Sequence, residues 1–159
     1  MLDTPKVVTT ELQMTAFIRI KVPRSEIREV MGPSRKELQN EVAAQGIAMT
    51  GPWFTHHLRL NPATFDFELS VPVAKPVKPA GRIQPGEWPA MKMAQAVYAG
   101  PFEGLGAAWK EFDRWIWDQG LTPAEDLWER YVTGPETSSD PAAWRTELSR
   151  RLIPGEDQR

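Results

Sequence analysis

Residues 64–73, TFDFELSVPV, alternate apolar and polar side chains along their whole length. Because successive residues of a strand point to opposite faces, this period of two predicts a half-buried β-strand. A second extended stretch, residues 53–60, precedes it across the turn-forming segment Asn61-Pro62-Ala63, so the two stretches form a predicted hairpin. The side of the return strand that we expect to face the core holds Phe65, Phe67, Leu69 and Val71.

This hairpin ends a pattern that the chain repeats. Its return strand contains Glu-Leu-Ser at 68–70, and the same three residues recur at 147–149, within the last predicted strand at 144–153. A Gln-Gly pair closes a predicted helix at 45–46 and again at 119–120, where glycine suits the position just after a helix. The order strand, helix, hairpin therefore occurs twice, which indicates a duplicated β-α-β-β unit.

Both predicted helices are amphipathic. We expect the first as a main helix at 34–45, separated from an earlier turn by Gly32-Pro33-Ser34, because proline interrupts a helix. The second opens at Gly100-Pro101-Phe102. Its apolar residues recur at steps of three and four, so we assign them to the core. They include Leu105, Ala108, Trp109, Phe112, Trp115 and Ile116.

These elements predict an α+β fold of two pseudo-symmetric β-α-β-β repeats that form an antiparallel sheet with the helices on one face. We expect a single domain over residues 1–159, with repeat one at about 7–73, a connector at 74–80 and repeat two at about 81–153. Two such repeats side by side leave a groove between them, which we expect on the sheet face opposite the helices. A groove of this kind is a natural ligand cleft.

The composition excludes several function classes. The chain has no cysteine, which rules out disulfides and thiolate chemistry. Its formal net charge of −2 comes without a basic face, so we expect no specific DNA binding. We find no apolar run of transmembrane length and no signal peptide, and we therefore expect a cytoplasmic protein that makes no membrane contact.

Metal and cofactor chemistry are not expected either. His56 and His57 are the only histidines, and adjacent strand residues point to opposite faces, so the spacing offers no metal site. There is also no phosphate-binding loop or dinucleotide fingerprint.

Glu129 is the carboxylate that the sequence singles out. It lies within a predicted strand at 127–133, next to Trp128, in a chain whose seven tryptophans are a high number for 159 residues. A carboxylate among aromatic side chains is costly to bury unless it is paired, which favours a ligand site where it attracts a cation or acts as a general base. The alternative is an exposed Glu129 paired with an arginine. Tyr131 falls on the same strand face as Glu129.

Several motifs of the two halves share their order and spacing with a known family. They are Gly51-Pro52-Trp53, residues 65–73, Gly100-Pro101-Phe102, Gln119-Gly120-Leu121, residues 129–133 and residues 144–148. Together they resemble the GyrI-like small-molecule-binding domain, over nearly the whole chain. The resemblance implies two β-α-β-β repeats with a cleft between them.

In bacterial multidrug regulators of the AraC and MerR types, this effector-binding domain is fused to a DNA-binding helix-turn-helix. There it binds cationic, aromatic drugs with a buried Glu and stacking aromatics. We expect no such fusion in a chain of 159 residues, which is similar to the stand-alone members. The resemblance implies a protein that binds amphipathic, aromatic or cationic compounds. One alternative is a hydrolase of cyclopropane-bearing genotoxins. Another is a gyrase-inhibitor type that binds a protein partner.

The resemblance and the repeat together give the candidate site. If the protein is an enzyme, Glu129 and Tyr131 are its catalytic residues. Thr55 and His57 match those two positions in the first repeat. Trp144 stacks on a planar ligand in one interpretation and packs in the core in the other. The full set of predicted ligand-binding residues is Glu129, Tyr131, Trp88, Phe102, Trp144, Trp53, Thr55 and His57.

Overall fold

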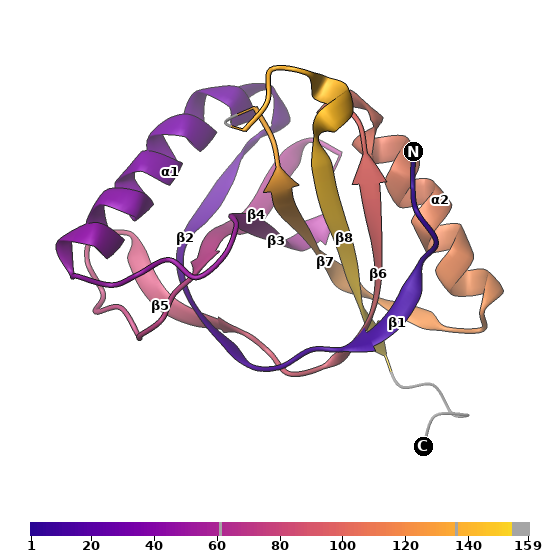
Figure 1. The fold of residues 1–159 in the computed structure, drawn as a ribbon, viewed down its shortest axis with the longest axis horizontal. Helices are drawn as coiled ribbons and strands as arrows, with labels where there is room; N and C mark the ends of the chain where they lie inside the picture. Colours follow the sequence, from indigo (N-terminus) through magenta and orange to yellow (C-terminus); the bar gives the residue numbers. More distant parts are fainter. Residues whose placement is uncertain (61, 136, 154–159) are drawn as a thin grey trace. The chain divides into compact units, whose positions relative to one another are not determined.

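The computed structural model describes residues 1–60, 62–135 and 137–153 (Figure 1). Its helices are α1 (Ile27–Ala44) and α2 (Leu105–Asp118), each preceded by a short 3₁₀ turn, Arg24–Glu26 and Phe102–Gly104. Its strands are β1 (Lys6–Thr9), β2 (Gln13–Pro23), β3 (Phe54–Leu60), β4 (Thr64–Pro72), β5 (Ile83–Trp88), β6 (Lys92–Ala99), β7 (Thr122–Thr133) and β8 (Arg145–Ile153). Neither described helix is long and apolar enough to span a membrane.

The chain divides into two compact units. We call Glu11–Ala90 the first-repeat unit, and Met1–Thr10 together with the chain from Met91 the second-repeat unit. The described strands of the first-repeat unit form an antiparallel sheet in the order β3-β4-β2-β5. Those of the second-repeat unit form one in the order β7-β8-β6-β1. The two orders correspond strand for strand, so the predicted α+β fold with a repeated β-α-β-β order is confirmed.

Each helix covers one face of its own sheet. Leu38 and Val42 of α1 share a core cluster with Ile18 and Leu69, and all four are almost fully buried. In the second-repeat unit, Phe112 and Ile116 of α2 share a cluster with Leu148, and all three are fully buried. The apolar side of each helix thus packs on the apolar side of its strands, as the sequence predicts.

A short segment outside each β-α-β-β order completes each sheet. β1 pairs with β6, so the first strand of the chain belongs to the second-repeat sheet. β5 pairs with β2 and extends the first-repeat sheet in the same position. Residues 7–22 are largely extended, as predicted, but they are divided between the two units. The repeat boundaries and the single domain proposed from the sequence stay predictions.

The first helix differs from its prediction. α1 runs without a break from Ile27 to Ala44 and includes Pro33. Proline removes one N–H from the helix and leaves the carbonyl four residues earlier, on Glu29, without its usual donor. Glu29 is exposed, so water can satisfy that carbonyl. Burial of Leu38 and Val42 on the sheet then holds the helix together through the proline.

Candidate functional site: an aromatic cluster around Glu129

Glu129 lies on β7, on the sheet face that α2 covers. It pairs in register with Leu148, a fully buried member of the core beneath α2, and paired residues share a face. We expected a ligand groove on the face opposite the helices; Glu129 does not lie on that face, and the groove itself stays a prediction. The alternation of side chains along the strand correctly placed Glu129 on the opposite face from its sequence neighbours. It could not tell which of the two faces the helix covers.

Two side chains hold the Glu129 carboxylate. The indole Nε1–H of Trp109, on α2, donates to Glu129 Oε2 at 2.7 Å. The hydroxyl of Tyr131, two residues along β7, donates to Glu129 Oε1 at 2.9 Å. Both donors and the acceptor are half-buried. The two hydrogen bonds fix the orientation of a partly desolvated carboxylate, which satisfies the requirement that a buried charge be hydrogen-bonded.

Two further aromatic side chains of the same unit continue from Tyr131 through ring contacts. Phe102, in the turn before α2, lies 4.8 Å from the Trp144 ring centroid and 6.0 Å from that of Tyr131. Trp144 is anchored by its indole N–H, which donates to the carbonyl of Ser138 at 2.9 Å. Phe102 remains 37% exposed. We call Glu129, Trp109, Tyr131, Phe102 and Trp144 the Glu129 cluster.

A buried tyrosine shapes the turn that carries Phe102. The Tyr98 hydroxyl donates to the carbonyl of Pro101 at 2.8 Å. Gly100 has φ of +140°, a conformation that favours glycine, and its N–H donates to the Trp144 carbonyl at 3.0 Å. A Cβ on Gly104 would overlap the Tyr98 hydroxyl oxygen. The turn therefore closes over Tyr98, and its backbone also ties the Phe102 segment to Trp144.

Four predicted site residues thus come together: Glu129, Tyr131, Phe102 and Trp144. Trp109 was missed, because its helical spacing assigned it to the core. It does pack against that core, next to Phe112 with ring centroids 5.7 Å apart, but its N–H end reaches the carboxylate. A half-buried tryptophan usually finds an acceptor for this N–H, which is the signal that could have identified it.

The other predicted residues lie in the first-repeat unit. Thr55 is almost fully buried, and its hydroxyl is 2.9 Å from His57 Nε2. Trp53 packs against the core of that unit, and the Arg35 guanidinium carbon lies over its ring, 5.2 Å from the centroid. Trp88, also among the predicted ligand-binding residues, is only 3% exposed and meets Phe54 edge-on at 5.0 Å. A ligand-binding role for these residues stays a prediction.

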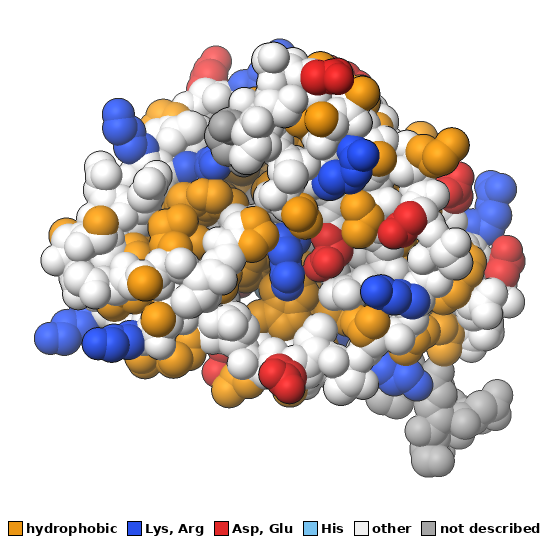
Figure 2. Space-filling view, viewed as in Figure 1, with side chains coloured by type: hydrophobic (Ala, Val, Ile, Leu, Met, Phe, Trp, Pro, Cys, Tyr) orange, Lys and Arg blue, Asp and Glu red, His pale blue; other side chains and the backbone are white. Residues whose placement is uncertain are grey.

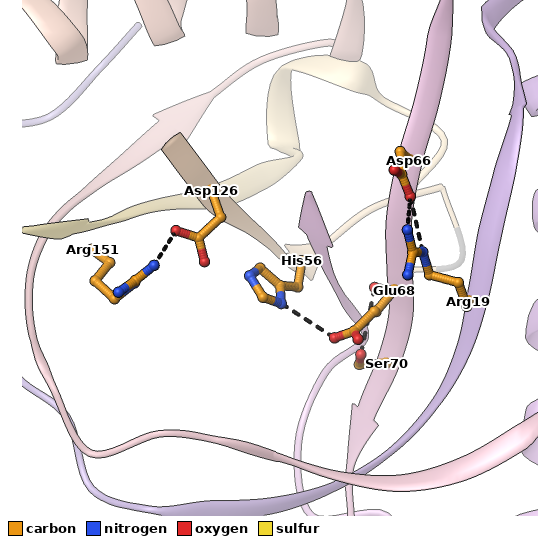
Figure 3. A network of polar contacts seen from close by, with 7 residues as sticks. All are labelled: Arg19, His56, Asp66, Glu68, Ser70, Asp126 and Arg151. Atoms are coloured by element: carbon orange, nitrogen blue, oxygen red, sulfur yellow. Dashed lines mark hydrogen bonds and ion pairs between the residues drawn. The ribbon is translucent and has the colours of Figure 1, made fainter. Parts of the chain in front are cut away.

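Charged pairs occupy the sheet faces that carry no helix. In the first-repeat unit, His56 contacts Glu68 at 3.2 Å, and Arg19 binds Asp66 at 2.6 Å (Figure 3). In the second-repeat unit, Arg151 binds Asp126 at 2.8 Å (Figure 3). Arg130 of the same unit lies 3.6 Å from Glu147. The arginine next to Glu129 in sequence therefore pairs across the strand with a different glutamate.

Charges of both signs are interspersed on the face of the molecule that Figure 2 shows. The absence of specific DNA binding and the cytoplasmic location stay predictions.

The fold is shared with several solved structures. The C-terminal domain of EcmrR aligns with a TM-score of 0.84 and 22% identity, over 94% of this chain and 97% of that domain. EcmrR in complex with DNA aligns with a TM-score of 0.83 and 22% identity, over 94% of this chain. The alignment covers 57% of that chain, so this protein spans little more than half its length.

Two further neighbours differ more in sequence. A hydrolase from Listeria innocua aligns with a TM-score of 0.70 and 11% identity, over 94% of this chain and 91% of that one. SAV2435 bound to tetraphenylphosphonium aligns with a TM-score of 0.59 and 10% identity, over 99% and 100% of the two chains. No protein of curated function matches the sequence.

Because these sequence identities are low, the solved structures show only that the chain shares their fold, a duplicated α+β domain. The sequence itself gives the family, because the pattern of the GyrI-like small molecule binding domain matches residues 4–152. The chain belongs to that family, as the motifs of both repeats indicated.

Proposed function

We propose that the protein binds lipophilic aromatic cations at the Glu129 cluster. The observation that carries this proposal is the half-buried Glu129 carboxylate, which Trp109 and Tyr131 orient by hydrogen bonds. The Phe102 ring contacts the Tyr131 ring, and the Trp144 ring contacts Phe102 in turn. A partly desolvated carboxylate attracts a cation more strongly than an exposed one, because the local dielectric is lower. Ring faces add cation–π attraction and bury the apolar surface of the ligand.

The family supports the same proposal. Small-molecule binding is the property for which the GyrI-like family is named. One protein with the same fold, SAV2435, has been seen with tetraphenylphosphonium, an aromatic cation. That compound is therefore a suitable first probe for this chain.

The experiment compares Glu129→Gln with the wild type. Glutamine keeps the shape, and its amide oxygen can still accept from Trp109 while its NH₂ donates to the Tyr131 hydroxyl. We expect roughly 10- to 100-fold weaker binding of tetraphenylphosphonium, since the coulombic attraction between two charges several ångströms apart in a partly desolvated site is about 1–3 kcal/mol. Binding of neutral triphenylphosphine oxide should change less than about twofold. Quenching of tryptophan fluorescence measures both affinities.

The matched control is Glu125→Gln, which removes the same charge from an exposed position on β7. It should leave both affinities unchanged. If Glu125→Gln and Glu129→Gln weaken cation binding equally, the effect is one of net charge and the proposed site is wrong.

A hydrolase is the second candidate, and the hydrogen bond from Tyr131 to Glu129 favours it. A tyrosine hydroxyl bonded to a carboxylate can position a water from which Glu129 takes a proton. The hydroxide then attacks the strained carbon of a cyclopropane, the ring bond breaks, and the ring carbon accepts the proton. Glu129→Gln should lower turnover of such an electrophile roughly 100-fold or more, with little loss of binding. No turnover by the wild type would remove this candidate. The gyrase-inhibitor alternative stays a prediction.

A further inference from the structure

Four of the five positions of the Glu129 cluster have a counterpart in the first-repeat unit that follows from the strand register and the turns. Glu129 pairs with Leu148 of the second Glu-Leu-Ser, and Thr55 pairs with Leu69 of the first. Thr55 therefore occupies the Glu129 position, and His57 that of Tyr131. The strands confirm this alignment, because their register shifts just after Tyr131 in β7 and just after His57 in β3.

Phe102 and Trp144 also have counterparts. A proline precedes the 3₁₀ turn before each helix, so Arg24, the first residue of its turn, matches Phe102. Counting back four residues from the paired leucines, Phe65 matches Trp144. The equivalent pairs are in contact in both units. In the first-repeat unit, the Arg24 guanidinium carbon lies 4.3 Å from the Phe65 ring centroid. In the second-repeat unit, the ring centroids of Phe102 and Trp144 are 4.8 Å apart.

The charge of this second cluster is opposite to that of the first. Threonine stands where Glu129 supplies a carboxylate, and arginine stands where Phe102 supplies a ring. Aromatic surface remains, because His57 stacks on Phe67 at 5.2 Å and meets Phe65 edge-on at 6.1 Å. The repeat thus keeps a ring cluster and replaces the negative group with a positive one.

The arginine can be reached by a small molecule. Arg24 is exposed, while Phe65 and His57 are half-buried. A guanidinium has five N–H donors in one plane, in a geometry that matches a carboxylate or sulfonate. Its contact with Phe65 restricts the side chain, so less conformational entropy is lost when an anion binds.

We propose that Arg24, His57 and Phe65 form a second small-molecule site, which takes a planar aromatic anion carrying a carboxylate or sulfonate. The ring of the ligand lies against Phe65 and His57, and its charged group meets the Arg24 guanidinium. This site is independent of the function proposed above, because it uses other residues and selects the opposite ligand charge.

The test titrates naphthalene-2-sulfonate by isothermal calorimetry, with the neutral naphthalene-2-sulfonamide as the comparison ligand. Arg24→Gln should weaken sulfonate binding about tenfold or more, since a charge-assisted pair is lost. Arg24→Lys keeps the charge but not the planar fork, and should show most of that loss. Neither variant should change sulfonamide or tetraphenylphosphonium binding by more than about twofold.

The matched control is Arg114→Gln, which removes an exposed arginine from α2 of the other unit and gives the same net charge. It should leave sulfonate affinity within about twofold. The proposal is overturned if the wild type does not bind the sulfonate, or if Arg24→Gln has no effect. It is also overturned if Arg24→Gln and Arg114→Gln weaken sulfonate binding equally. None of these outcomes bears on cation binding, which Glu129→Gln tests separately.

Discussion

The fit of Tyr98 beneath the turn at Gly104 controls where Phe102 sits, and a single methyl group tests it. A Cβ on Gly104 would overlap the buried Tyr98 hydroxyl, which donates to Pro101. We expect Gly104→Ala to lower the free energy of unfolding by about 1–3 kcal/mol, because the phenol or the turn must shift. Chemical denaturation measures this loss.

The control lies two residues further on. A Cβ on Gly106 would have nothing within 4 Å, and Gly106 is inside α2, where alanine is the better helix former. Gly106→Ala should therefore raise stability by about 0.5–1 kcal/mol. Equal losses for the two alanines would show that the Tyr98 contact is not the cause. Tyr98→Phe should relieve part of the Gly104→Ala loss, since it removes the atom that overlaps.

Strand alternation was sufficient to place Glu129 and Tyr131 on one face, and their hydrogen bond agrees with that prediction. It could not reveal Trp109 as the second donor to the carboxylate. Helical periodicity treats tryptophan as uniformly apolar, whereas its N–H end and its ring have different environments here. The polar end of an amphipathic side chain is thus lost when residues are classed only as apolar or polar.

Between elements, one ion pair fastens α2 to the strands beneath it. Arg150 of β8 is buried, binds Asp113 of α2 at 2.6 Å and also donates to the Ala124 carbonyl at 2.9 Å. Burial raises the pKa of Asp113 above its usual value, and Arg150 opposes this rise only in part. The carboxylate is therefore less favourable in the folded than in the unfolded chain.

Arg150→Met should remove that opposition and raise the pKa of Asp113 further. A raised carboxyl pKa means that folding loses stability as pH rises from the unfolded value, 3.8, through the folded one. We expect the variant to lose roughly 3 kcal/mol at pH 7, since it leaves a half-buried charge unpaired, and clearly less near pH 4. Denaturation curves at the two pH values measure the difference. A loss that does not depend on pH would contradict this account.

Element types followed from the sequence better than element partners. The amphipathic stripes predicted both helices, although Pro33 wrongly suggested a break in α1. A local proline signal yields to tertiary packing when the carbonyl it orphans is exposed. β1 and β5 are short, and nothing in their local pattern states which strand they pair with. Their assignment to β6 and β2 depends on contacts distant in sequence.

At the scale of the whole molecule, the chain begins by completing the sheet of its second repeat. The N–H of Thr10 donates to the Met91 carbonyl, and N–H groups alternate in direction along a strand, so the Val8 N–H also points toward β6. The Val7 N–H points away from it. Val8→Pro removes a donor to the sheet, whereas Val7→Pro removes one that faces outward from an edge strand.

We expect Val8→Pro to cost roughly 1–3 kcal/mol more than Val7→Pro, because it leaves an acceptor on β6 without its donor. The loss should be local to one unit. Hydrogen exchange should speed up in β6 and β8 of the second-repeat sheet, while β2 and β4 keep their protection. Equal costs for the two prolines would mean that β1 contributes little to the sheet. Loosening confined to β2 and β4 would instead place the first strand in the repeat that it precedes.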